Sequence, residues 1–140
     1  MKKFHVLIFC LIGGIASFAV IYVSGEKSGN INEPAAISYN FQVRPVLSDK
    51  CYACHGPDAN KREAGLRLDI EKEAYKALKD NPKAHAIVPG KPNLSEVYLR
   101  VSTTDTSIMM PPASSNLPTL TDEEVTIIKK WIEEGAKYEP

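Results

Sequence analysis

The sequence predicts an all-α domain of about 100 residues in which long loops connect short helices. Apolar residues recur at helical spacing in several short segments, most regularly near the C-terminus. The one alternating stretch, residues 66–69, is too short to build a sheet, so we expect an extended segment against the core. Residues 102–118 form a long stretch rich in Ser, Thr and Pro, and loops of this length usually have a function.

The N-terminal segment has the pattern of an export signal. Lys2 and Lys3 precede an apolar run, residues 4–23, in which His5 is the only residue able to carry a charge. At about 1.5 Å per helical residue this run is long enough to span a bilayer. Residues 1–25 are therefore expected to be either a cleaved signal peptide or an N-terminal membrane anchor, in a protein that is periplasmic or held at the inner membrane.

In the remainder of the chain, composition separates a tether from a domain and limits the kinds of partner that the domain can bind. Residues 26–38 are polar and contain Gly, Asn and Pro, which is typical of a flexible tether, and residues 39–140 form the predicted domain. The chain has 17 basic and 17 acidic residues, and no segment gathers Lys and Arg on one face. This balance excludes a nucleic-acid-binding surface.

The first predicted helix begins after Ser38, which can cap it, and runs toward Cys51. Pro45 lies inside this helix and should bend or shorten it, because proline has no backbone donor. The sequence Gly56-Pro57-Asp58 is expected to end the helical segment. Its apolar residues are Phe41, Val43, Val46 and Leu47.

Two short helices are predicted in the middle of the chain. One covers residues 70–80, with Ala74, Ala77 and Leu78 on one side. The other follows the Pro89-Gly90-Lys91-Pro92 turn, with Asn93 and Glu96 as a possible cap pair. The residues expected to point inward from it are Leu94, Val97, Tyr98 and Val101.

The last helix has the most regular pattern. Thr121 and Glu124 have the spacing of a capping box, and Gly135 is expected to stop the helix. Its apolar stripe consists of Val125, Ile128, Trp131 and Ile132.

The most informative motif is Cys51-Tyr52-Ala53-Cys54-His55, a C-x-x-C-H sequence. At this spacing two thiols can add to the vinyl groups of a haem, and the adjacent imidazole can take one axial position on the iron. A dithiol redox switch and half of a zinc site are the alternatives, but the first needs a βαβ context and the second needs further ligands. No other cysteine follows the export segment, and this favours one covalently attached haem c.

The opposite face of such an iron needs a thioether or an imidazole. Met110 is the favoured ligand, because Pro111 and Pro112 restrict the backbone that follows it. Met109 is then expected to pack in the core or act as a lid, and His85 is the alternative sixth ligand.

Arg67 is a candidate partner for a haem propionate, since its planar fork suits a carboxylate. An ordinary surface arginine explains the same residue equally well.

The order of these motifs resembles the planctomycete-type cytochrome c domain. The resemblance covers roughly residues 39–138, and it implies a class I-like helical cytochrome c fold, thioether bonds at Cys51 and Cys54, and the iron ligands His55 and Met110. The segments that carry the resemblance are Phe41 to Leu47 with Pro45, Cys51 to Asp58, Lys61-Arg62, Gly65 to Asp69, Ile87 to Pro92, Ser95, Arg100-Val101, Met110-Pro111-Pro112, and Leu120 to Ala136.

These observations predict a mono-haem cytochrome that transfers single electrons between redox partner proteins. His–Met ligation leaves no open iron position and so favours electron transfer over chemistry on a substrate. One alternative is a haem enzyme or sensor, peroxidase-like, in which the Met110 loop opens the iron. Another is a subunit docked on a larger oxidoreductase, held at the membrane by residues 4–23.

Overall fold

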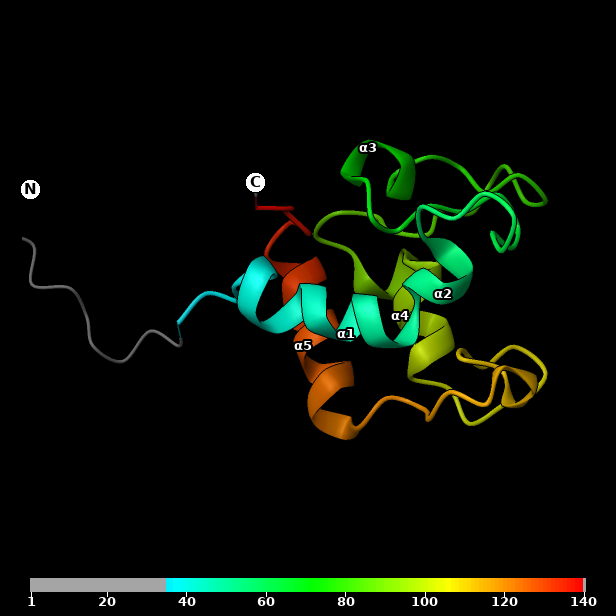
Figure 1. Cartoon of the computed structure of the whole chain (residues 1–140). Coiled ribbons are helices and arrows are strands. Elements are labelled where there is room, and N and C mark those ends of the chain that lie inside the picture. Colours follow the sequence, from blue (N-terminus) through cyan, green and yellow to red (C-terminus); the bar gives the residue numbers. More distant parts are fainter. Residues whose placement is uncertain (1–34, 140) are drawn as a thin grey trace, which may run out of the picture. The chain divides into compact units, whose positions relative to one another are not determined.

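The computed structural model describes residues 35–139, and the regular secondary structure in this range is helical (Figure 1). No strand occurs among the described residues, although isolated bridges join His85 to Ala77 and to Ser95. The all-α prediction is therefore confirmed. In chain order the helices are η1 (Tyr39–Val43), α1 (Arg44–Lys50), α2 (Tyr52–His55), α3 (Glu71–Ala74), η2 (Pro92–Leu94), α4 (Glu96–Val101), η3 (Ala113–Ser115) and α5 (Asp122–Glu133).

The predicted export segment, residues 1–25, and most of the predicted tether, residues 26–38, lie outside the described residues. Within residues 35–139 we find no helix with the length and apolar character needed to cross a membrane.

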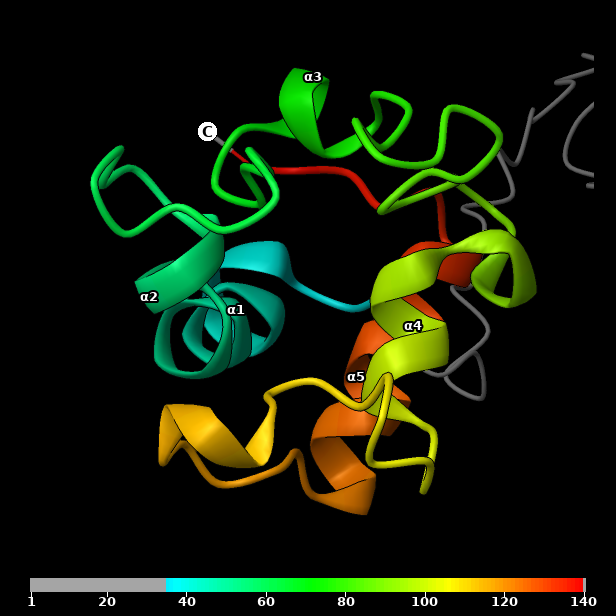
Figure 2. The same ribbon diagram turned by 90° about the vertical axis from the view of Figure 1, so that its right-hand side faces the viewer.

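The core lies where α5 contacts η1, η2 and α4. Figure 2 shows α4 and α5 side by side, with α1 and α2 across from them. Each fully buried aliphatic side chain of this core contributes about 1.5–3 kcal/mol to stability. The largest fully buried apolar side chains are Leu47, Ile87, Ile128, Ile132 and Val43.

The helix that leads to the cysteines changes type before its proline. η1 is a π-helix, in which the Arg44 amide donates to the Tyr39 carbonyl, and α1 begins at Arg44. Pro45 therefore lies in the first turn of α1, where a missing N–H leaves no helical hydrogen bond unmade. The proline shortens the α-helical part, as the sequence predicts.

The start of η1 is capped from the opposite end of the chain. Ser38 is the N-cap residue of this helix, as predicted, but its side chain makes no cap hydrogen bond to the helix. The Glu139 carboxylate accepts hydrogen bonds from the Ser38 hydroxyl (3.2 Å), the Tyr39 amide (3.2 Å) and the Asn40 amide (3.3 Å). A carboxylate suits the positive N-terminal end of a helix. The C-terminal residues thus fix the entry to the helix that carries the cysteines.

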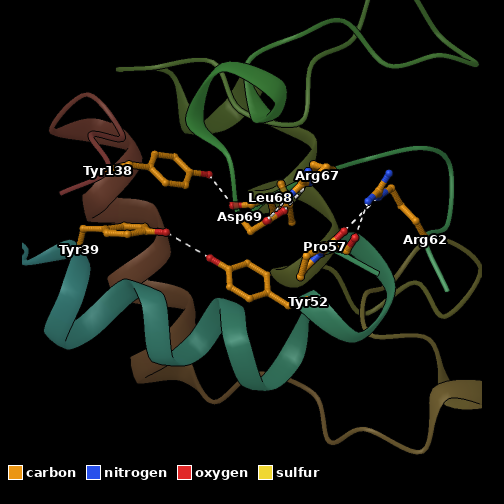
Figure 3. Close-up of polar contacts among 9 residues, drawn as sticks. Tyr39, Tyr52, Pro57, Arg62, Arg67, Leu68, Asp69 and Tyr138 are labelled. Atoms are coloured by element: carbon orange, nitrogen blue, oxygen red, sulfur yellow. Dashed lines mark hydrogen bonds and ion pairs between the residues drawn. The ribbon is translucent and has the colours of Figure 1, made fainter. Parts of the chain in front are cut away.

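Aromatic rings connect the C-terminal segment to the C-x-x-C-H motif (Figure 3). The Tyr39 ring lies 4.6 Å from the Tyr138 ring, and the Tyr39 and Tyr52 hydroxyl oxygens are 3.1 Å apart. The Tyr138 hydroxyl donates to the Leu68 carbonyl at 2.9 Å. Because Tyr52 lies between the two cysteines, this aromatic cluster supports the motif from the core side.

The last helix agrees with its prediction. Thr121 accepts from the Glu124 amide at 3.2 Å, and the Glu124 carboxylate accepts from the Thr121 amide at 2.7 Å, which completes the capping box. The helix ends at Glu133, two residues before Gly135.

The middle helices differ from their predictions. Only Glu71–Ala74 of residues 70–80 is helical, because the chain turns back and the Leu78 amide donates to the Ala84 carbonyl at 2.9 Å. Asn93 does not cap α4, whose N-cap residue is Ser95. Leu94 is 59% exposed and does not point inward, whereas Val97 is buried.

Candidate haem site

The C-x-x-C-H motif occupies one short helical turn. Cys51 joins α1 to α2, and its carbonyl accepts hydrogen bonds from the amides of Cys54 (3.1 Å) and His55 (2.7 Å). Residues three and four apart lie on the same side of a helix, so this spacing places Cys54 and His55 on the side of Cys51. Cys54 itself does not line the cavity that Cys51 and His55 share. The local helix therefore explains why the motif has this spacing.

A cavity of about 250 Å³ opens beside this turn. Cys51 and His55 form part of its wall, and Met110 reaches the same cavity from the loop between α4 and α5. The structure thus brings together three of the predicted site residues from two distant segments. The apolar part of the wall is formed by Ala64, Leu66, Leu68, Leu78, Ala86, Val97 and Val101.

The two alternative sixth ligands do not line this cavity. Met109 is half-buried and absent from the wall, while His85 is engaged in the two isolated bridges. Met110 is held at the wall by its amide, which donates to the Arg100 carbonyl at 3.0 Å. Of the three candidates, the geometry favours Met110.

The imidazole of His55 is suited to bind a metal in this environment. Burial, as the largest effect, lowers the pKa of His55 below its usual value, and Arg100 acts in the same direction. The neutral form, which has a free nitrogen lone pair, is therefore favoured. Its Nδ1 atom is buried and has no hydrogen-bond partner among the described residues. A half-buried neutral imidazole facing an apolar cavity fits the role of an axial ligand.

The two thiols also fit covalent attachment to a haem. Cys51 and Cys54 are both free and partly exposed. Burial, with a smaller effect of Cys54, raises the pKa of Cys51 to about 12. Cys51 therefore stays a neutral thiol in the protein without haem. Two thiols that can add to the vinyl groups, with an imidazole and a thioether that can bind the iron, are the groups that hold a c-type haem.

Arg67 does not line the cavity. Its guanidinium pairs with the Asp69 carboxylate, to which both Nε and Nη2 donate (Figure 3). This pairing lowers the pKa of Asp69 and raises the pKa of Arg67. Asp69 already occupies two donors of Arg67, and a contact of Arg67 with a propionate remains a prediction.

Sequence reasoning missed the polar residues that do line the cavity, namely Lys79, Asp80, Asn81, Glu96 and Arg100. The Arg100 guanidinium donates to Glu96 at 3.0 Å and to the Ile108 carbonyl at 3.4 Å. The spacing of Glu96 and Arg100, four residues apart on α4, indicates a helical ion pair but says nothing about a cavity. Only the fold shows that this arginine lies between the cavity and the Met110 loop.

An all-α fold in which a C-x-x-C-H turn opens on an apolar cavity, with a methionine in the same wall, has the features of a c-type cytochrome domain. Residues 51–114 match the family model described as Planctomycete cytochrome C. This match contains both the C-x-x-C-H motif and Met110, so the resemblance seen in the sequence is confirmed for this part of the chain. Comparisons with curated proteins and with solved structures found no match.

Proposed function

We propose that this protein is a mono-haem c-type cytochrome that carries single electrons. In this proposal Cys51 and Cys54 hold one haem through thioether bonds, and His55 and Met110 coordinate its iron. When bound, the haem supplies one reversible one-electron couple. The observation that carries the proposal is the shared cavity, which Cys51, His55 and Met110 line together.

The chain's own residues would keep this site closed to substrates. Leu66, Leu68 and Val97 would cover the ring with apolar surface and exclude water, which limits solvent access to the metal. His55 and Met110 would occupy both axial positions, and an iron without an open position transfers electrons and does not activate a substrate.

The proposal includes export and redox partner proteins. The pattern of residues 1–25 supports translocation to the periplasm or to the periplasmic face of the inner membrane. A six-coordinate iron exchanges electrons without binding a substrate, so the proposal requires an electron donor and an electron acceptor, and redox partner proteins would fill these roles.

The test is covalent haem attachment in protein exported from a host that matures c-type cytochromes. Mass spectrometry of wild-type protein should show one haem that survives denaturation. The variant with both Cys51→Ser and Cys54→Ser should lose that haem and give little folded protein. A wild-type chain that folds and matures normally without a haem would contradict the proposal. A high-spin ferric spectrum of the resting protein would support the alternative of a haem enzyme or sensor.

A further inference from the structure

Four successive carbonyl groups, from Cys54 to Pro57, accept hydrogen bonds from one segment, residues 62–68. We call this set the carbonyl clamp. The bonds are Glu63 amide to Cys54 carbonyl (2.8 Å), Leu68 amide to His55 carbonyl (2.8 Å), Arg62 Nε to Gly56 carbonyl (3.0 Å) and Arg62 Nη2 to Pro57 carbonyl (2.8 Å).

The carbonyl clamp compensates for the shortness of α2. The last carbonyls of any helix lack partners within the helix, and they form its negative end. α2 has four residues, too few to be stable in isolation. The orientation of His55, its last residue, therefore depends on bonds from outside the helix.

Arg62 makes a contribution that the other members of the clamp do not make. Two of the four bonds come from backbone amides, which almost any residue would supply, whereas the other two come from one guanidinium. Its planar fork can serve two successive carbonyls at once, which a single ammonium group cannot do with the same geometry. Arg62 is half-buried, so its charge is incompletely screened by solvent. Figure 3 shows the Arg62 side chain directed at the Pro57 carbonyl.

The turn held by Arg62 has little freedom to take another path. Gly56 is buried, and a Cβ atom added to it would lie 2.3 Å from the Tyr52 carbonyl oxygen. The backbone after His55 is thus packed against Tyr52 on one side and bonded to Arg62 on the other.

We propose that Arg62 is a positioning residue for the His55 ligand, and that its charge raises the reduction potential of the site. This inference rests on the proposed function, that is, on a haem held by Cys51, Cys54 and His55. The bidentate contact fixes the turn that follows His55. Arg62 does not line the cavity, but its guanidinium is bonded to the carbonyls one and two residues after His55. A cation this close to the ligand stabilises the reduced form, because the reduced form carries one positive charge fewer than the oxidised form.

The test uses the haem-loaded protein and the variants Arg62→Gln, Arg62→Lys and Lys61→Gln. Lys61 is the matched control, because it is exposed and its side chain has no hydrogen bond or ion pair within residues 35–139. Redox titration gives the potential, and paramagnetic NMR of the oxidised protein gives the shifts of the His55 ring protons.

Arg62→Gln should move the redox equilibrium toward the oxidised form by about threefold to tenfold; tenfold corresponds to about 59 mV for one electron. It should also move the His55 ring signals. Arg62→Lys should keep most of the potential and still move the His55 signals, since it keeps the charge but not the fork. Lys61→Gln should change the equilibrium by less than about twofold.

An Arg62→Gln protein that melts at a lower temperature but keeps the potential and the His55 shifts would show a purely structural role and overturn the inference. If Arg62→Gln does not fold, unchanged His55 shifts in Arg62→Lys overturn the positioning role. Absence of haem in the wild-type protein is a different failure, seen before any variant is compared, and it overturns the proposed function itself together with this inference.

Discussion

The two walls of the cavity are built in different ways. On the His55 side, the carbonyl clamp, the buried Gly56 and the Tyr39–Tyr52 contact hold one short turn from several directions. On the Met110 side the chain is irregular over most of residues 102–118. There the Met110 amide donates to the Arg100 backbone carbonyl, and the Arg100 guanidinium donates to the Ile108 carbonyl of the loop at 3.4 Å.

The difference follows from what each wall would have to do. Two thioether bonds and an imidazole need a fixed spacing, which a held helical turn provides. A single thioether ligand needs only to reach the metal, and methionine has an unbranched side chain that adapts to its surroundings. A rigid frame is therefore needed on one side of the cavity, while an anchored loop is sufficient on the other.

The largest expected effect comes from disturbing the rigid side. Gly56→Ala should destabilise the protein by about 3 kcal/mol, because the added methyl group meets the Tyr52 carbonyl oxygen at 2.3 Å and the backbone has to move. Chemical denaturation of the haem-loaded protein measures the change.

Gly65→Ala is the matched control for this steric effect. Gly65 has φ 66°, but a Cβ there would meet no atom within 4 Å. Only the cost of a left-handed backbone applies, about 1 kcal/mol. Equal losses in the two variants would mean that close packing at Gly56 is unimportant.

Hydrogen exchange compares the two walls directly. The Glu63 and Leu68 amides belong to the carbonyl clamp, whereas the Ile108 and Met109 amides bond only to the Asp105 carbonyl within the exposed loop. Exchange of the loop amides should be faster by at least about tenfold, since local opening there breaks fewer contacts. Equal protection of the two pairs would remove the contrast between the walls.

A smaller effect on stability is expected at the start of η1, the helix that leads to the C-x-x-C-H turn. Glu139→Gln keeps an oxygen acceptor but removes the charge that caps η1, so the free energy of unfolding should fall by about 0.5–1 kcal/mol. The control is Glu133→Gln, which removes only a surface pair with Lys129 at 3.6 Å and should cost less than about 0.5 kcal/mol. A larger loss in the control would show that the cap from Glu139 is not the anchor of this helix.

Features of this fold that depend on residues close together in the sequence were predictable, and features that depend on residues far apart in the sequence were not. The capping box and apolar stripe of α5 and the C-x-x-C-H turn are local, and they were predictable. The end of α3 at Ala74 was not predictable from local sequence. The hydrogen bond from Leu78 to Ala84 and the bridge from Ala77 to His85 override the helical periodicity of this segment.

The remaining features of the site are long-range. Glu139 caps a helix that begins 100 residues earlier in the chain, and no local sequence pattern predicts this contact. Arg62 and Arg100 both occur in segments of the family pattern, yet neither the clamp nor the cavity wall follows from their spacing. The motif therefore predicted the candidate ligands, while the fold was needed to find the residues that support them.

The smallest expected effect is a pH dependence of stability at Asp69, the residue after Leu68 of the carbonyl clamp. The bond from Arg67 lowers the pKa of Asp69, so this carboxylate stabilises the fold above its unfolded pKa of about 3.9, and that stability is lost as the pH falls through the lower folded pKa. Asp69→Asn should have a slightly lower free energy of unfolding than wild type at pH 7, and this difference between the two proteins should disappear in acid. A difference in the free energy of unfolding that is the same at pH 7 and in acid would contradict the assignment of this effect to the Arg67–Asp69 pair.

The near-infrared absorption of the oxidised, haem-loaded protein tests most directly whether the cavity holds an iron between His55 and Met110. Wild type and Met109→Ala should both show the charge-transfer band of a methionine–iron bond, and Met110→Ala should lack it. A band that persists in Met110→Ala, or a wild-type protein without one, would contradict the account.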